Sequence, residues 1–254
     1  MFSKDLGIDL GTMFTRLADG TQVLLNEPTI VAIEVLDQKM VAVGQEAKDM
    51  YGRVPESIEV ARPLKNGVIA DYEITETLLS YLLQRVSGSM RIFRPRVMIT
   101  VPYGVTSVER RAVYEAVLEA GSRDASLIQQ PLAAALGVDL PINSPSGNMV
   151  ICLGGGCTEA AVMAMYGIVS AETLRAGGME LDEAIVNYVR RKYGVVIGQA
   201  TAEQLKMKIG AAVPLDTGAT LIPSAEAAAA LSRTHEDRSD LSDRTDQTDQ
   251  ANRG

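Results

Sequence analysis

The chain is poor in aromatic and sulfur-containing residues. Its 254 residues include no tryptophan, one histidine and two cysteines, and 4% of them are aromatic. The histidine, His235, stands in a polar C-terminal stretch, which argues against histidine-based catalysis and a histidine-rich metal site. Two cysteines are too few for a disulfide scaffold and fit a reducing compartment. The core is therefore expected to be aliphatic.

Long apolar runs and an excess of positive charge are also absent. No apolar run reaches about 18 residues, so no transmembrane helix is expected. Asp5 and Asp9 interrupt the stretch in which a signal peptide would need its apolar segment, so none is expected. The net charge of −8 argues against nucleic acid as a partner. The length suffices for one or two domains with a sizeable core.

A strand pattern that ends in a glycine turn opens the chain. In Asp5-Leu-Gly-Ile-Asp-Leu-Gly-Thr12, apolar residues alternate with small or acidic ones, and the strand pattern resumes from Thr15 to Leu17. A glycine lets backbone N–H groups approach a bound anion closely. Asp9 could hold water around a hard cation such as Mg²⁺. Taken alone, a plain hairpin explains this stretch equally well.

The same pattern returns in the middle of the chain. Met149-Val-Ile-Cys-Leu-Gly-Gly-Gly-Cys-Thr158 is again an apolar strand that runs into glycines, and Ala160 to Met165 is predicted as the returning strand. The repetition predicts a duplicated architecture. Two such turns facing each other across a cleft would hold a polyphosphate from both sides.

The remaining pattern alternates strands with helices, which indicates an α/β fold. A turn is predicted at Asn26–Pro28, between two strands within 21–35. Val97–Val101 is a continuous apolar run, typical of a parallel strand covered on both faces. Helices are predicted over 71–87, 106–120, 131–137, 180–193 and 201–212, the last capped by Thr201. Gly167–Leu174 is predicted as a strand pair, and the polar stretch 232–254 as disordered.

Several segments together resemble the MreB family of bacterial actins. They are Asp5–Thr12, Asn26–Pro28, Pro63–Gly67, Val68–Asp71, Ser146–Met149 with Leu153–Gly156, and Leu181–Ile185. The match covers roughly residues 1 to 215. The resemblance implies an actin/Hsp70-like, ribonuclease H-like duplicated nucleotide-binding fold, with ATP and Mg²⁺ in a cleft between two lobes.

The resemblance also implies site residues and subdomains. The first phosphate turn would be Thr12, Met13 and Phe14, and the second Gly154, Gly155, Gly156 and Cys157. The nucleoside would be bordered by Glu203, Gln204, Leu205 and Lys206. The first-lobe core would comprise 1–32 and 66–145, with a small subdomain at 33–65. The second-lobe core would be 146–180, followed by the start of another subdomain at 181–215 and a divergent tail at 216–254.

Members of this family form ATP-dependent filaments on the inner face of the bacterial membrane, where they guide cell-wall synthesis and rod shape. The resemblance therefore implies that other copies of the chain, the inner membrane surface and the cell-wall elongation machinery are partners of a cytoplasmic, membrane-peripheral protein. Ile92 and Phe93 stand between Arg91 and Arg94 in a predicted loop, a pattern that suits shallow membrane insertion. A buried loop tip is the alternative reading.

The sequence departs from the family pattern at its acidic positions. Cys152 replaces an aspartate, and Gln129-Gln130 replaces the Glu-Glu pair in which a glutamate helps to activate water. A thiol is a poor Mg²⁺ ligand, and glutamine accepts no proton at neutral pH. Gln129 and Gln130 would then form a degenerate water-positioning site, so weak hydrolysis is expected.

Two further departures concern the first turn and the end of the chain. Met13-Phe14 replaces Ala-Asn, and Phe14 either crowds the phosphates or joins the core, which base rates slightly favour. Family-like sequence ends near Leu215, so the second lobe is expected to be incomplete, through truncation or as a short form, and to expose strand edges and apolar surface. The alternative functions are a regulatory subunit that co-assembles with an active MreB and a non-polymerising ATPase of the same fold.

Overall fold

The structure, a computed structural model, describes residues 5–37, 39–87 and 94–211. Residues up to Lys206 belong to one compact unit. A second unit starts at Met207 and is described only to residue 211. The proposed membrane residues Ile92 and Phe93 and the polar stretch 232–254 lie outside the described residues. No helix in the described ranges is both long and apolar enough to cross a bilayer.

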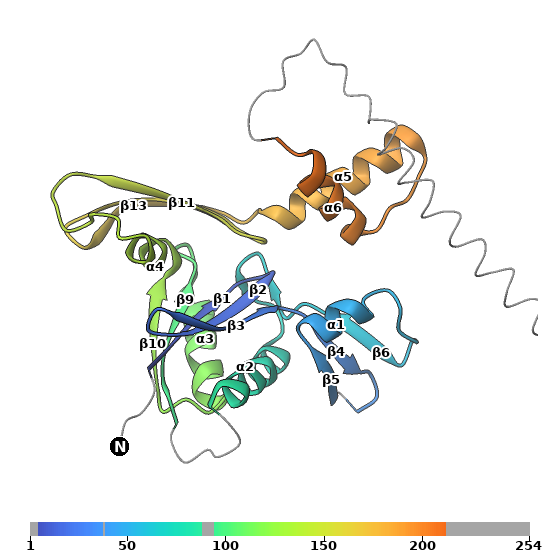
Figure 1. Cartoon of the computed structure of the whole chain (residues 1–254), viewed down its shortest axis with the longest axis horizontal. Coiled ribbons are helices and arrows are strands. Elements are labelled where there is room, and N and C mark those ends of the chain that lie inside the picture. The colour runs from blue at the N-terminus through green and yellow to red at the C-terminus, as the bar shows by residue number, and fades with distance from the viewer. Residues whose placement is uncertain (1–4, 38, 88–93, 212–254) are drawn as a thin grey trace, which may run out of the picture. The chain divides into compact units, whose positions relative to one another are not determined.

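A five-stranded mixed sheet organises the first half of the chain, in the order β10-β9-β1-β2-β3 (Figure 1). The antiparallel part consists of β1 (Asp5–Leu10), β2 (Phe14–Asp19) and β3 (Gln22–Pro28). Two later strands, β9 (Arg96–Val101) and β10 (Asp124–Gln129), run parallel to β1. The first glycine turn therefore connects β1 and β2 at the sheet's centre.

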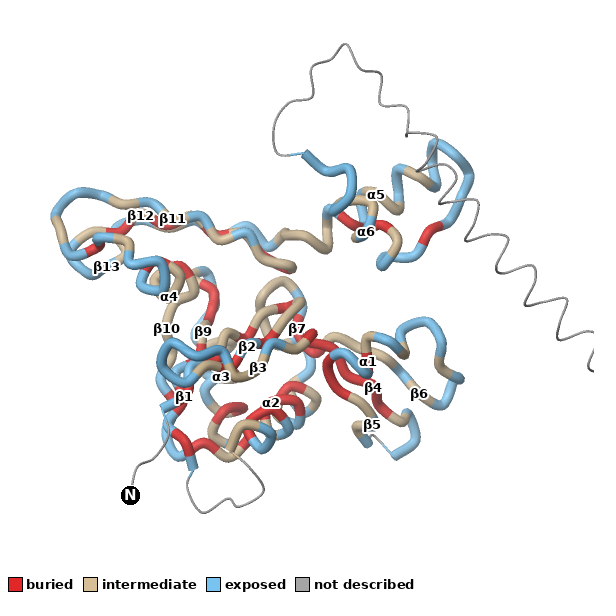
Figure 2. Tube along the Cα trace, in the orientation of Figure 1, coloured by how far each residue is buried: buried red, intermediate tan, exposed pale blue. Residues whose placement is uncertain are grey.

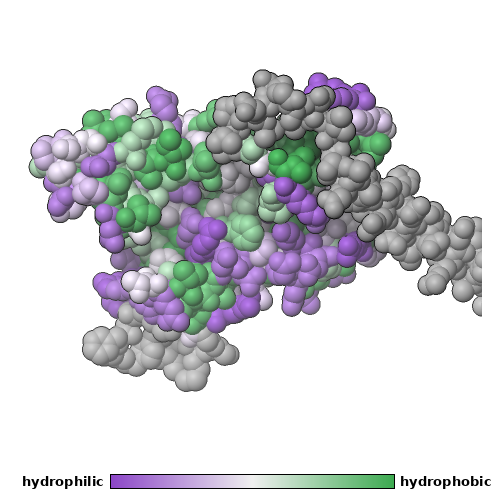
Figure 3. All heavy atoms as spheres, turned by 45° about the horizontal axis from the view of Figure 1, so that its top comes forward, coloured by the Kyte–Doolittle hydropathy of each residue, from purple (hydrophilic) through white to green (hydrophobic). Residues whose placement is uncertain are grey.

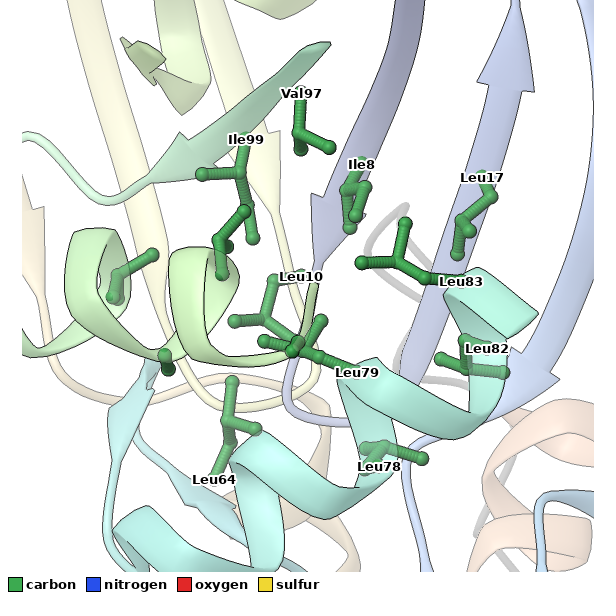
Figure 4. Packing of buried hydrophobic residues seen from close by; sticks show 14 of the residues in the cluster. Ile8, Leu10, Leu17, Leu64, Leu78, Leu79, Leu82, Leu83, Val97 and Ile99 are labelled. Carbon is green, nitrogen blue, oxygen red and sulfur yellow. The ribbon is translucent and has the colours of Figure 1, made fainter. Parts of the chain in front are cut away.

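Two helices contribute the side chains that bury one face of this sheet. They are α2 (Tyr72–Ser87) and α3 (Ser107–Glu119). Alternate strand residues pack against leucines of α2 in one aliphatic core, shown in Figures 2 and 4. Each fully buried side chain of this kind contributes roughly 1.5–3 kcal/mol to folding. The predicted start of α3 is confirmed: the Thr106 side chain accepts from the Glu109 N–H, and Glu109 accepts from the Thr106 N–H.

A small subdomain follows β3. Its sheet has the order β5-β4-β6, formed by β4 (Val31–Glu34), β5 (Lys39–Val43) and β6 (Ile58–Ala61). Helix α1 (Gln45–Met50) packs on it around Ile30, Ala32 and Ala47. A two-stranded ribbon, β7 (Leu64–Lys65) and β8 (Val68–Ile69), then returns the chain to the first sheet.

The second half is built on a three-stranded antiparallel sheet of β11 (Asn148–Leu153), β12 (Thr158–Ala164) and β13 (Gly167–Leu174). Helix α4 (Gln130–Gly137) covers one face, around Ala135 and Met163. The opposite face exposes Met149, Ile151, Leu153 and Leu174. Figure 3 shows hydrophobic residues at the surface in this region. Helices α5 (Gly178–Tyr193) and α6 (Gln199–Ile209) follow.

Some predicted boundaries are wrong. Asn26–Pro28 ends β3 instead of forming a turn, because an edge strand tolerates proline. Gly167–Leu174 is one strand, and the turn before it is made by Met165 and Tyr166 at positive φ.

Three more predictions need correction. Thr201 lies inside α6, which begins at Gln199, so it does not cap the helix. Helix α5 begins at Gly178, two residues before the predicted start at 180. Burial alternates along β9 and leaves Met98 exposed, so this strand is not covered on both faces.

Candidate functional site

The two glycine turns have the same backbone hydrogen bond. In the first, the Gly11 N–H donates to the Phe14 carbonyl at 3.1 Å, and in the second the Gly154 N–H donates to the Cys157 carbonyl at 2.8 Å. Each bond joins a glycine that follows a strand to the residue three positions later. The repeated sequence pattern thus corresponds to a repeated local structure.

The two turns also meet. Gly155 lies against the side chain of Met13, and a Cβ atom on Gly156 would lie 2.6 Å from Thr12 Oγ1. Only glycine permits so close an approach at these positions. The Thr12 hydroxyl in turn accepts the N–H of Gly67 at 2.9 Å. The structure therefore brings together Thr12, Met13 and the second-turn glycines, as the sequence interpretation requires.

The start of α5 is attached to the second turn. The N–H groups of Gly178 and Met179 donate to the carbonyls of Gly154 and Gly155 at 3.0 and 2.9 Å. Lys206 of α6 reaches the same place: its Nζ donates to the Gly178 carbonyl at 2.8 Å and lies 2.7 Å from Asp182 Oδ1. Helices α5 and α6 are thereby fixed to the turn that would hold phosphate.

A cavity of about 330 Å³ opens beside the turns. Met13 lines it together with Met179 and Asp182 of α5 and with Glu203 and Gln204 of α6. The other predicted nucleoside residues, Leu205 and Lys206, are not among its lining residues. A second depression of about 460 Å³ lies on α3 and β10, and none of its lining residues belongs to either turn. The 330 Å³ cavity is therefore the candidate ligand site.

The small subdomain supplies a basic wall of this cavity, which the sequence interpretation missed. Lys48, Arg53 and Arg62 line it, along with Asp49 and Tyr51. The Arg62 guanidinium donates to the Thr29 carbonyl at 3.3 Å, and burial lowers its pKa. These residues lie in a segment whose sequence carries no phosphate-binding motif, so only the fold brings them to the site.

Asp9, the residue expected to organise Mg²⁺, already has partners on both carboxylate oxygens. Its Oδ2 accepts from the Arg16 guanidinium at 3.0 Å, and its Oδ1 accepts from the Thr100 hydroxyl at 3.1 Å. Asp9 and Arg16 are directly opposite in the β1–β2 register. The magnesium role of Asp9 remains a prediction, and this pairing argues against it.

The two cysteines add no anionic ligand. Burial raises the pKa of the Cys152 thiol and raises the pKa of the Cys157 thiol to about 11. Both thiols are therefore neutral at neutral pH. In the described part of the chain, no three Cys, His, Asp or Glu side chains are grouped as metal ligands. This donor set does not fit a metal ion held directly by the protein.

Glu159 on β12 was not singled out by the sequence interpretation. It is fully buried, and its Oε1 accepts from the Tyr103 N–H at 2.6 Å and from the Thr173 hydroxyl at 3.2 Å. No described group pairs with its Oε2. Burial raises its pKa above the usual value of a glutamate. Its inward direction follows from alternation with Ala161 and Met163, which the sequence does show.

The remaining predicted residues lie around this centre. Gln129 ends β10 and Gln130 begins α4; both are half-buried, and neither lines the cavity. Their water-positioning role remains a prediction. Phe14 is half-buried and stands outside the buried clusters, with the charged groups of Arg16 and Lys48 at 5.8 and 5.9 Å from its ring centre. The slight preference for Phe14 as a core residue is therefore wrong.

A further contact joins the second sheet to α3. The Arg175 guanidinium, just after β13, lies 3.0 Å from Glu109 Oε1, and Glu109 Oε2 accepts the Thr106 N–H at 2.7 Å. Together with the Tyr103–Glu159 hydrogen bond, this contact fixes the β9–α3 connection against β12 and β13.

Comparisons with known proteins agree with this arrangement. A family model described as MreB/Mbl protein matches residues 3–236. The cell shape-determining protein MreB of Escherichia coli K12 is 48% identical over 222 residues, which cover 85% of this chain and 64% of the relative. The cell shape-determining protein Mbl of Bacillus subtilis 168 is 41% identical over 215 residues, covering 84% and 65%. The chain thus spans slightly less than two thirds of these relatives.

Solved structures show the same fold. The crystal structure of MreB5 of Spiroplasma citri bound to AMPPNP superposes with a TM-score of 0.78 at 32% identity, covering 85% of this chain and 65% of that one. The MamK double helical filament gives a TM-score of 0.68 at 21% identity, covering 81% and 64%, and supports the fold alone. The fold is therefore the actin-like duplicated nucleotide-binding fold that the sequence predicted.

Proposed function

Because the chain belongs to the MreB/Mbl family, we propose that it is an actin-like protein that binds ATP between its two glycine turns and acts in filaments that determine rod cell shape. The observation that carries this proposal is the contact of the two turns, Gly155 against Met13 and Gly156 against Thr12, beside a cavity. The relative from Spiroplasma citri was solved with AMPPNP and with ADP.

ATP binding is tested by calorimetric titration of the full-length chain. The expected result is saturable binding that is lost in Gly156→Val, because the branched side chain would collide with Thr12 and with the backbone of Asn66. Gly137→Ala is the matched control, since a Cβ there meets no described atom within 4 Å. Absence of ATP binding by a folded wild-type chain would contradict the proposal.

Hydrolysis is proposed to be weak. Gln129 and Gln130 cannot serve as general bases, and loss of general-base help typically lowers a rate by about 10²–10⁴-fold. Cys152 is a neutral thiol where the family pattern has an acid. Phosphate release from the purified chain tests this. Turnover equal to that of an intact MreB assayed in parallel would refute weak hydrolysis.

Mg²⁺ is the expected companion of ATP in this family. When bound, it would neutralise phosphate charge and order the water around it. The residues present offer it little: Asp9 is engaged by Arg16 and Thr100, and the two thiols are neutral. We therefore assign no step to a metal ion held by these residues.

Self-assembly and a position at the inner face of the membrane are proposed from family membership. The cell-wall elongation machinery is the proposed partner. The subdomain boundaries are proposed on the same basis.

The apolar pair Ile92 and Phe93, with its flanking arginines, is the proposed membrane contact. Replacing both residues by serine should abolish co-sedimentation with anionic liposomes, and unchanged binding would reject this role.

A regulatory subunit is the second candidate function. It is favoured by the loss of the acids at 129, 130 and 152 together with the occupied state of Asp9. A regulatory subunit would enter filaments only with an active MreB. Sedimentation of the chain alone and with an intact MreB separates the two candidates, because a self-sufficient filament protein pellets in both mixtures. A chain that pellets in neither would be a non-polymerising ATPase of the same fold.

A further inference from the structure

Arg16 gives the first turn a cation of its own. It stands on β2 directly opposite Asp9 of β1, and its guanidinium lies 3.0 Å from Asp9 Oδ2. Arginine remains charged at every pH at which a protein is folded. Because the Thr100 hydroxyl donates to Oδ1, both oxygens of Asp9 are engaged. The carboxylate that could order the water shell of a divalent ion is therefore paired with a side chain.

The other acidic and sulfur groups near the turns do not replace Asp9. Cys152 and Cys157 are neutral thiols. Glu159 is fully buried and has no ion-pair partner among the described residues, and burial raises its pKa. The turns themselves therefore offer no free carboxylate, whereas Asp49, Asp182 and Glu203 line the neighbouring cavity.

Positive charge also continues from Arg16 toward the candidate cavity. Arg16 and Lys48 place their charged groups 5.8 and 5.9 Å from the ring centre of Phe14. Lys48 itself lines the cavity, as do Arg53 and Arg62. The Arg16 side chain is 48% exposed and lies outside the set of residues that line the cavity. A guanidinium binds phosphate oxygens in pairs, and an ammonium binds them as a point charge.

We infer that Arg16 takes the place of a divalent cation at Asp9, so that a nucleoside polyphosphate binds between the two turns without one. The inference rests on the proposed nucleotide site and specifies how that site neutralises phosphate charge. Arg16 moves from Asp9 to the phosphates or bridges the two, and Lys48 supplies the second positive charge. A surface ion pair that merely stabilises the β1–β2 hairpin is the competing explanation.

The test is calorimetric titration of the full-length chain with ATP, once in MgCl₂ and once in EDTA. The expected dissociation constants agree within about twofold, which corresponds to about 0.4 kcal/mol. Binding in MgCl₂ alone overturns the inference and leaves the proposed nucleotide site intact. No binding in either solution, by a chain that circular dichroism shows to be folded, overturns both.

Variants of the pair separate a ligand-binding role from a structural one. Arg16→Leu should weaken ATP binding in EDTA by about tenfold or more, the worth of a charge-assisted hydrogen bond, while Arg16→Lys keeps most of the affinity. The matched control is Arg96→Leu, which breaks the other Arg–Asp pair of β1, at Asp5, and leaves affinity unchanged. Unchanged affinity of Arg16→Leu overturns the inference.

Asp9→Asn provides a second variant that does not remove the cation. If Arg16 supplies the charge, this variant binds ATP in EDTA at least as tightly as the wild type, because the guanidinium is released. If Asp9 serves a metal ion instead, Asp9→Asn weakens binding in MgCl₂ and does not bind in EDTA, and the inference fails.

Discussion

The two glycine turns have the same backbone hydrogen bond and differ in the side chains that surround them. Each has the same glycine N–H to carbonyl bond three residues on. Under the first, the carboxylate of Asp9 is partly exposed and paired with Arg16. Under the second, the carboxyl of Glu159 is buried and unpaired at one oxygen, and burial raises its pKa. The turn thus has the same backbone geometry in both halves, whereas its chemistry depends on the neighbouring residues of each half.

The supports of the two turns differ as well. The first rests on a sheet whose buried cluster holds 20 hydrophobic residues, while the cluster beneath the second sheet holds four, counted within the described ranges. The second sheet also presents Met149, Ile151 and Leu153 to solvent. The two turns therefore keep the same local geometry although the hydrophobic clusters beneath them differ in size.

The largest expected effect concerns these two cores. Leu79→Ala removes a fully buried side chain from the larger cluster and should lower the free energy of unfolding by about 3–5 kcal/mol. Met163→Ala in the smaller cluster should cost about 2 kcal/mol, because half-buried neighbours can close the cavity. Urea denaturation followed by circular dichroism measures both. Equal losses would remove the contrast between the halves.

The next effect concerns the contact between the turns. Gly156→Ala places a Cβ 2.6 Å from Thr12 Oγ1 and 3.0 Å from the Asn66 amide nitrogen, and should cost about 1–3 kcal/mol through overpacking. Gly137→Ala, at the end of α4, should be neutral or slightly stabilising. A thermal shift assay compares the two variants. A Gly156→Ala protein as stable as the wild type would show that the turns can separate freely.

A smaller, pH-dependent effect distinguishes the two carboxyl groups. Burial raises the pKa of Glu159 above its unfolded value, so its contribution to stability is fully present below about pH 4.5 and is lost as pH rises through the folded-state pKa. Glu159→Gln should therefore be more stable than the wild type at pH 8, with the gain shrinking toward pH 4. Chemical denaturation at several pH values measures this. A gain that is independent of pH would show that the pKa of Glu159 is the same in the folded and the unfolded chain.

The smallest effect is expected on the exposed face of the second sheet. Ile151→Thr replaces a side chain that is 58% exposed and should change the free energy of unfolding by no more than about 0.5 kcal/mol. The same urea titration measures it. A loss above about 2 kcal/mol would mean that this face is covered in solution, in contrast to the structure.

Much of the frame could be predicted because its signals are local. Alternating Leu6, Ile8 and Leu10 followed by Gly11 predicted a strand and a turn, and the recurrence at 149–158 predicted the second. The helix predicted over 106–120 corresponds to α3, which Thr106 caps. The boundaries that failed depend on tertiary context: Pro28 is tolerated because β3 is an edge strand, and Thr201 is inside α6 because that helix begins two residues earlier.

The site could be predicted in its turns and at Glu203 and Gln204, which line the cavity. The repeated glycines are visible in the sequence, whereas Thr12, Met13, Glu203 and Gln204 were implied by the family resemblance. Arg16 was missed because a strand arginine is ordinary until its cross-strand partner is known. Lys48 and Arg62 were missed because the fold of a separate subdomain brings them to the cavity.

Glu109 takes part in two contacts that acid weakens: the hydrogen bond that caps α3 and the ion pair with Arg175. Its pKa is lowered, first by the N–H of Thr106 and then by Arg175, so the stability it contributes is present above its unfolded pKa of about 4.5 and disappears as pH falls through the folded-state value. Protonation of Glu109 weakens the start of α3 and also weakens the ion pair with Arg175, which joins α3 to the second sheet. Both contacts should therefore weaken along a common titration curve.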